Sequence, residues 1–302
     1  MAPFATHGRR DSVAAVRTVA VLSLKGGVGK TSVVLGLAGA AMIRGVRTLV
    51  VDLDPQGNAT SALEPDETEC TLADVLSDPS EETLRAAIAP TAWDDNVDVL
   101  VGAEEVEVHN RPDPDAIRLG RLAEALSHLD KLADEDNPPY RLVLLDSPPS
   151  LGQLTRSALV AADRALLVTE PTMFSVTGVQ RAFEAVHAER EQHNPDLQPL
   201  GVVVNRVRTH LMEHEYRIRE LREIFGPLVL PISLPDRSAV QHAQGACVPV
   251  QRWGTPGARE ISVAYQSLLA RVLRTSRYRR PGSPPALADE ASEEDYAPEQ
   301  AG

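Results

Sequence analysis

Residues 25–31 have the composition and the setting of a loop that binds phosphate. They read Lys-Gly-Gly-Val-Gly-Lys-Thr and lie between an apolar run typical of a buried strand and an Ala-, Leu- and Val-rich run typical of a helix. Glycine permits backbone angles that turn successive N–H groups toward phosphate oxygens, and a helix N-terminus adds partial positive charge. Lys30 can reach the β- and γ-phosphates of a nucleotide, and the Thr31 hydroxyl suits Mg²⁺.

The expected phosphate-binding residues extend from this loop into the following helix. They are Lys25, Gly26, Gly27, Val28, Gly29, Lys30, Thr31 and Ser32. The usual pattern, GxxxxGK[ST], begins with a glycine, but Leu24 stands at that position and Lys25 follows it. Lysine occurs elsewhere only at Lys131, and arginine supplies the remaining positive charge. We infer that the two loop positions require lysine.

Three aspartates at the ends of apolar runs are candidates for organising a metal ion. Asp52 and Asp54 follow a run rich in β-branched residues, and Asp146 ends four consecutive apolar residues. Because Mg²⁺ prefers oxygen ligands, we expect Thr31, Asp54 and Asp146 to hold it. Asp52 is expected to support the loop and the metal shell. An Asp-x-Asp-Pro sequence by itself is also typical of a capping aspartate in a surface loop.

The elements around these residues alternate between strands and helices. The predicted strands are 17–23, 48–52, 97–101, 142–146, 165–169, 200–205 and 228–232. The predicted helices are 32–44, 72–76, 81–88, 116–133, 154–162, 176–191, 213–225 and 258–274. This order predicts an α/β fold with a mainly parallel twisted sheet flanked by helices. In such sheets ligands bind at the carboxyl ends of the strands, where the motifs above fall.

Together these motifs resemble the ParA/MinD family of P-loop ATPases with a deviant Walker A motif. The carriers are KGGVGKT, VVDLDPQGN at residues 50–58 and LVLLDSPPS at 142–150, and the resemblance runs from about residue 17 to residue 274. It implies ATP and Mg as cofactors. It also implies that Lys25 crosses to the ATP of a partner subunit and that Asp54 orients the attacking water. Lys25, Lys30 and Asp54 are thus the expected catalytic residues.

The same resemblance places the base of the nucleotide between two segments. It implies adenine contacts from Asn205 and Arg206, at the end of a predicted strand, and from Pro235 and Asp236 in a later turn. The Asn205 amide carries both a donor and an acceptor, which match N6 and N7 of adenine. An asparagine that ends a strand is also a common turn former.

For function, the resemblance implies an ATP-dependent dimerising switch that acts in DNA segregation or in positioning a large cargo on the nucleoid. Such proteins form an ATP-sandwich homodimer, bind DNA without sequence preference, and hydrolyse ATP slowly until a ParB-like partner stimulates them. The candidate DNA-binding residues are Arg206, Arg208, Arg271 and Arg274, although each could belong to a solvated helix face. The net charge of −13, and Asp236 and Ala239 where relatives often carry arginine, weaken this inference.

Two other functions remain open from the sequence. A MinD-like positioning ATPase would bind membrane through an amphipathic C-terminal helix, and the run around Leu268, Leu269 and Val272 has some of that character. We favour a core-packing final helix and do not expect a membrane partner, because an anchor usually ends the chain and the tail is acidic. A non-catalytic, ATP-gated interaction module is the other alternative.

The predicted organisation is one large domain with two loose ends. We expect a flexible lead at residues 1–15, a ParA-like ATPase domain at 16–276, and a disordered acidic tail at 277–302. No apolar run approaches the roughly 20 residues needed to span a bilayer, so we expect a cytoplasmic protein, associated with the nucleoid if it binds DNA. Cys70 and Cys247 indicate neither a disulfide framework nor a metal cage.

Overall fold

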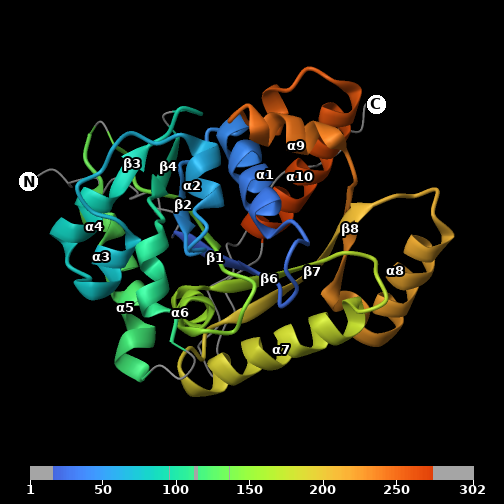
Figure 1. Cartoon of the computed structure of the whole chain (residues 1–302), viewed down its shortest axis with the longest axis horizontal. Helices are drawn as coiled ribbons and strands as arrows, with labels where there is room; N and C mark the ends of the chain where they lie inside the picture. The colour runs from blue at the N-terminus through green and yellow to red at the C-terminus, as the bar shows by residue number, and fades with distance from the viewer. Residues whose placement is uncertain (1–15, 95, 112–114, 136, 275–302) are drawn as a thin grey trace, which may run out of the picture.

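The computed structural model describes residues 16–94, 96–111, 115–135 and 137–274. The predicted lead at 1–15 and the predicted tail at 277–302 lie outside these residues. The described chain forms a sheet of eight strands in the order β3-β4-β2-β5-β1-β6-β7-β8, with helices on both faces (Figure 1). All neighbouring strands run parallel except β3 and β4. The predicted α/β fold with a mainly parallel sheet is confirmed.

The strands and helices lie close to the predicted positions. The strands are β1 (Arg17–Leu22), β2 (Thr48–Asp52), β3 (Ile88–Pro90), β4 (Val97–Leu100), β5 (Leu142–Asp146), β6 (Arg164–Thr169), β7 (Gln198–Val207) and β8 (Val229–Pro235). The helices are α1 (Lys30–Ile43), α2 (Asn58–Leu63), α3 (Leu72–Ser77), α4 (Glu81–Ala87), α5 (Ala116–Leu126), α6 (Gln153–Ala161), α7 (Ser175–Gln192), α8 (Met212–Phe225), α9 (Ser238–Gly245) and α10 (Pro256–Arg274).

Each face of the sheet has its own hydrophobic core. Helices α1, α2, α9 and α10 cover one face, and α3 to α8 cover the other (Figure 1). Alternate residues of β1 divide between the cores, so that Val19 and Val21 pack on one side and Ala20 and Leu22 on the other. This explains why the central strands are continuous apolar runs: both of their faces are covered.

One predicted helix was too long, and three of the elements given above were not predicted. The helix expected over 116–133 ends at Leu126 and is followed by a separate 3-10 turn, Leu129–Leu132. The Ser127 hydroxyl donates a hydrogen bond to the carbonyl of Glu124, which satisfies the end of α5 with a local side chain. Because Leu126 and Leu129 keep a helical spacing across the end of α5, the sequence carries no sign that the helix stops there. Helices α2 and α9 and the short strand β3 were not predicted.

Helix α10 packs into the core, as favoured from the sequence. Its apolar side chains, which include Tyr265, Leu268 and Leu269, are buried against α1. A side chain at Gly36 of α1 would collide with the ring of Tyr265, so glycine is required for this close approach. The tyrosine hydroxyl donates to the carbonyl of Ser32 at 3.0 Å. Within the described ranges, every helix is too short or too polar to cross a bilayer.

The sheet brings the predicted motifs together at the carboxyl ends of its central strands. Strand β5 lies between β1 and β2, and Asp146 is the register partner of both Asp52 and Val21. The loop that follows β1 leads directly into α1. Residues from three separate parts of the chain therefore meet at the carboxyl ends of the strands.

Candidate nucleotide-binding site

The loop between β1 and α1 has the backbone of an anion-binding cradle. Gly27 and Gly29 adopt φ angles of 79° and 84°, in the left-handed region that disfavours other residues. A Cβ at Gly29 would lie 2.5 Å from Nδ2 of Asn205, so a side chain is also excluded by space. Gly29 caps α1 without any side-chain hydrogen bond, which leaves the first N–H groups of the helix available to an anion.

Lys30 lies among the carboxylates rather than in solvent. Lys30 is only 7% exposed. Burial lowers the pKa of Lys30, and the nearby Asp146 and Asp54 act in the opposite direction. A buried ammonium has lost its hydration, and a bound polyanion would stabilise its charged form. The geometry therefore agrees with a lysine that grips phosphate.

Asp146 is fully buried, and among the described residues neither carboxylate oxygen makes a hydrogen bond of normal geometry. Burial, together with the charge of Asp52, raises the pKa of Asp146. The Thr31 hydroxyl lies close enough to act in the opposite direction and lower this pKa. Two orphaned buried carboxylate oxygens are costly unless a cation or a donor pairs with them. Beside the Thr31 hydroxyl, this arrangement fits a hard cation.

The described residues contain no group of three or more His, Cys, Asp or Glu side chains that could hold a metal alone. An ion bound here would therefore complete its shell with the Thr31 hydroxyl, water and phosphate oxygens. This is the usual pattern of Mg²⁺, which keeps several waters and binds through few carboxylates plus substrate phosphates. Thr31, Asp54 and Asp146 are the residues that would hold it.

Asp52 and Asp54 differ in their partners. The Asp52 carboxylate is buried and accepts hydrogen bonds from the backbone N–H of Thr60 at 2.8 Å and from its hydroxyl at 2.9 Å. Burial raises the pKa of Asp52. Asp54 is half-buried, and among the described residues its carboxylate accepts a hydrogen bond only from the N–H of Gln56, at 3.1 Å. Asp52 is thus tied into the scaffold, as expected of a support, whereas Asp54 keeps an oxygen for other partners.

The four residues predicted to contact a base line one small cavity of about 30 Å³. Its walls are Ser32, Asn205, Arg206, Pro235, Asp236, Arg237, Val240, Gln241, Ile261 and Tyr265. Sequence reasoning missed the contributions of α9 and α10 to this cavity, because α9 was not predicted and the burial of Tyr265 has no local signal. The side-chain nitrogens of Asn205 and Arg206 contact the phosphate loop itself, at the carbonyls of Val28 and Gly27.

Lys25 lies at the rim of the site beside apolar side chains. Its ammonium donates to the Thr172 hydroxyl at 3.2 Å. Lys25 also lines a cavity of about 610 Å³ together with Leu24, Pro149, Ser150, Leu151, Phe174, Thr177, Gly178 and Arg181. Phe174 and the adjacent Met173 are each 68% exposed. The sequence carried no signal for Thr172 or for this exposed apolar surface.

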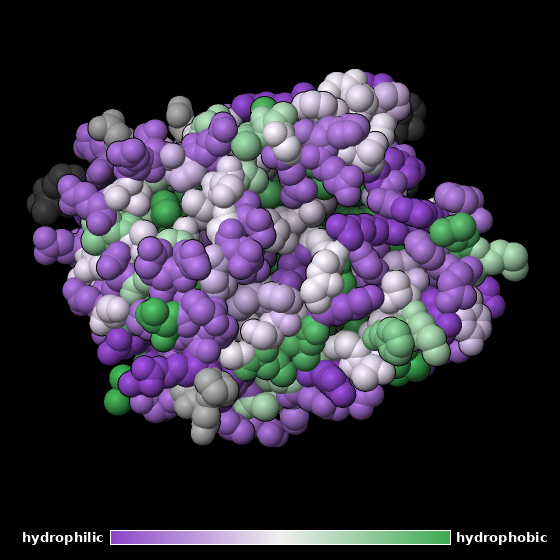
Figure 2. All heavy atoms as spheres, viewed as in Figure 1, coloured by the Kyte–Doolittle hydropathy of each residue, from purple (hydrophilic) through white to green (hydrophobic). Residues whose placement is uncertain are grey.

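The candidate DNA-binding arginines occupy two places. Arg206 forms an ion pair with Glu170 near the phosphate loop, and Arg208 pairs with Asp236 at 2.6 Å. Arg271 and Arg274 are exposed in the last turn of α10. Figure 2 shows one face of the molecule as mainly hydrophilic, with hydrophobic residues gathered beside α7 and around α8.

Comparison with known proteins identifies the family of the chain. The model of the family described as an AAA domain matches residues 16–199. The chromosome partitioning protein ParA of Caulobacter vibrioides is 30% identical over 269 residues, which cover 88% of this chain and 97% of the relative. The chromosome-partitioning ATPase Soj of Thermus thermophilus is 32% identical over 265 residues, which cover 86% and 98%.

A solved structure agrees in fold. The crystal structure of cobyrinic acid a,c-diamide synthase from Mycobacterium smegmatis with bound ATP analog and magnesium has a TM-score of 0.68 and 27% identity, covering 86% of this chain and 95% of that one. The resemblance drawn from the loop and the aspartates is therefore confirmed: this chain belongs to the ParA/MinD family of partition ATPases, as a ParA-type member.

Proposed function

We propose that this protein binds Mg-ATP at the carboxyl edge of its sheet. The single observation that carries the proposal is the fully buried Asp146 carboxylate, whose two unpartnered oxygens lie near Lys30 at the end of the cradle. Bound Mg²⁺ would neutralise charge on the phosphates. Lys30 grips the β- and γ-phosphates, Thr31 and Asp146 hold the ion, and Asp54 helps to order its waters.

The protein acts as an ATP-dependent dimerising switch. Asp54 orients the attacking water, and hydrolysis of ATP is slow. Lys25 reaches from one subunit to the ATP of the other and offsets negative charge there, as an arginine finger does. The exposed apolar side chains of Leu151, Met173 and Phe174 near Lys25 support an interface at this rim.

The paired form binds DNA without sequence preference and positions a chromosome, a plasmid or another large cargo. A ParB-like partner stimulates hydrolysis, and the subunits separate afterwards. The relatives named as chromosome partitioning proteins support this role. Arg208, Arg271 and Arg274 are the proposed contacts to DNA phosphates. The protein resides in the cytoplasm and, through DNA, at the nucleoid. The burial of the apolar face of α10 argues against the MinD-like membrane alternative.

Light scattering of the purified protein tests the switch. With Mg-ATP the wild type and Asp54→Ala are expected to dimerise, and the Asp54→Ala dimer persists because hydrolysis is blocked. Lys25→Ala is expected to bind ATP and remain monomeric. A matched control, Arg85→Met, removes an exposed arginine that pairs with Glu81. A wild type that stays monomeric and shows no affinity for Mg-ATP contradicts the proposal.

Two further measurements separate the alternatives. Retention on nonspecific DNA across a salt series, with Arg208→Ala and with Arg271→Ala/Arg274→Ala, tests the DNA role, because each lost phosphate contact reduces the salt slope by about one. Cargo positioning that survives Asp54→Ala in cells would instead favour the non-catalytic, ATP-gated module.

A further inference from the structure

Two adjacent residues at the end of β7 contact the outer side of the phosphate loop. The Asn205 amide nitrogen donates to the carbonyl oxygen of Val28 at 2.8 Å, and a guanidinium nitrogen of Arg206 donates to the carbonyl oxygen of Gly27 at 2.7 Å. These are consecutive peptide groups of the loop. Two neighbouring side chains thus hold two neighbouring carbonyls.

The covalent geometry of the peptide group gives these contacts a consequence. In a trans peptide the C=O of one residue and the N–H of the next point in opposite directions. A Gly27 carbonyl held by Arg206 therefore turns the Val28 N–H away from β7, and a Val28 carbonyl held by Asn205 turns the Gly29 N–H away in the same manner. Among the described residues, neither N–H donates a hydrogen bond. Successive N–H groups turned the same way make an anion-binding concavity.

The surroundings fix both side chains in place. Asn205 is 5% exposed, and the absence of a side chain at Gly29 allows its amide to approach the loop. Arg206 adopts a φ of 53°, which is unfavourable for a residue with a side chain. Strain of this kind persists only where other contacts hold it. Glu170, at the end of the neighbouring β6, accepts from the same Arg206 nitrogen at 2.8 Å.

We infer that Asn205 and Arg206 are positioning residues for the phosphate cradle, and that Glu170 holds Arg206 in register. They act through the Gly27 and Val28 peptide groups rather than by touching phosphate. This role differs from base recognition, which the family resemblance assigns to the same two residues. The inference rests on the proposed function in one respect, because the ligand of the cradle is taken to be a triphosphate.

A ligand without a base separates the two roles. Calorimetric titration with Mg²⁺ and inorganic tripolyphosphate, ATP or GTP is compared for wild type, Arg206→Met, Arg206→Lys and Arg85→Met. Positioning predicts that Arg206→Met lowers the affinity for all three ligands by the same factor, about tenfold, because one charge-assisted hydrogen bond is lost. Lysine keeps one cationic donor and restores part of the affinity. Arg85→Met leaves all three affinities unchanged.

Base recognition predicts a different pattern. If Arg206→Met binds tripolyphosphate as the wild type does and loses only the preference of ATP over GTP, the positioning role is overturned. Thermal unfolding of the ligand-free proteins checks that each variant folds. Should Arg206→Met fail to fold, Glu170→Gln makes the same test. Positioning predicts that this variant binds all three ligands about threefold more weakly. Unchanged affinities would contradict the positioning role. A wild type without affinity for Mg-ATP or tripolyphosphate refutes the proposed function itself.

Discussion

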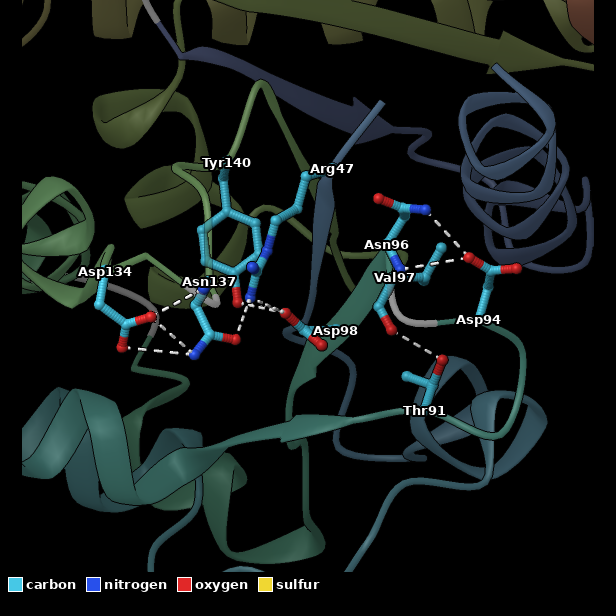
Figure 3. Close-up of polar contacts among 9 residues, drawn as sticks. All are labelled: Arg47, Thr91, Asp94, Asn96, Val97, Asp98, Asp134, Asn137 and Tyr140. Carbon is cyan, nitrogen blue, oxygen red and sulfur yellow. Dashed lines mark hydrogen bonds and ion pairs between the residues drawn. The ribbon is translucent and has the colours of Figure 1, made fainter. Parts of the chain in front are cut away.

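Two buried aspartates, at opposite ends of the parallel strands, show that the same type of side chain can serve two purposes. Asp98, at the amino end of β4, accepts hydrogen bonds from Arg47 at 3.0 Å and from the Tyr140 hydroxyl at 2.6 Å (Figure 3). Asp146, at the carboxyl end of β5, accepts no hydrogen bond of normal geometry from the part of the chain that the structure describes. A buried carboxylate with internal partners stabilises the fold, whereas one without partners marks the place where a ligand must bind.

The Asp98 carboxylate is paired within its cluster, although Nε of Arg47 is buried there without a hydrogen-bond partner among the described residues. The Arg47 guanidinium lies 4.9 Å from the centre of the Tyr140 ring, and Asn137 accepts a further hydrogen bond from it. Burial, followed by the charge of Asp98, raises the pKa of Tyr140, so its hydroxyl remains a donor. This network ties the segment before β5 to the first residues of β2 and β4 (Figure 3).

The largest expected effect comes from neutralising Asp146. Asp146→Asn should reduce Mg-dependent ATP turnover by about a hundredfold or more, because a group that stabilises developing charge is lost. The ligand-free protein should gain about 1 kcal/mol of unfolding free energy, because the burial that raises the pKa of Asp146 opposes folding and a neutral amide avoids this cost. Urea unfolding with and without Mg-ATP measures both. A less stable ligand-free variant would contradict this account of Asp146.

Removing the carboxylate at the amino ends of the strands should instead destabilise the fold and leave ligand binding unchanged. Asp98→Ala leaves Arg47 buried without its partner and should lower the unfolding free energy by about 3 kcal/mol. Affinity for Mg-ATP should stay unchanged at a temperature where the variant is folded. Glu81→Ala, which breaks the exposed pair with Arg85, is the control and should cost less than about 0.5 kcal/mol.

The contrast between the motif residues at the carboxyl ends of the strands and the Asp98 cluster at the amino ends also explains what the sequence could predict. The sequence could predict that the loop and the aspartates lie close together because each lies within a short motif next to an apolar strand, and strand ends converge in a parallel sheet. The pairing of Arg47 with Asp98 and Tyr140 joins residues that are 51 and 93 positions apart, without any local pattern. The sequence placed Asn205 at the end of a strand, but its contact with Val28 depends on how β7 packs beside the loop.

Removing one hydroxyl should sharpen the comparison. Tyr140→Phe keeps the ring that packs on Arg47 and loses the 2.6 Å hydrogen bond to Asp98. We expect a loss of about 1 kcal/mol of unfolding free energy, because Arg47 still compensates the carboxylate. Chemical denaturation of Tyr140→Phe beside Asp98→Ala measures the two steps. A loss as large as that of Asp98→Ala would mean that Arg47 contributes little.

The smallest effect is expected at His109, which is half-buried and contacts the Ala73 carbonyl at 3.1 Å. Burial, opposed by this hydrogen bond, lowers the pKa of His109 in the folded state. The unfolded state therefore binds the proton more tightly, and stability should fall as pH decreases through about 6.5, by less than about 1 kcal/mol. Unfolding at pH 7.5 and 5.5 should show a smaller difference in His109→Gln. His187→Gln, at an exposed position, is the control.

The two outer strands have a consequence for how copies of this protein meet. Strand β3 is three residues long and ends at Pro90, and β8 carries Pro231 and Pro235. Proline offers no amide hydrogen, so neither margin of the sheet presents a continuous row of donors to a passing strand. At high protein concentration, pairing between the sheets of two copies is thus disfavoured. Copies then associate through side-chain surfaces, which can dissociate again.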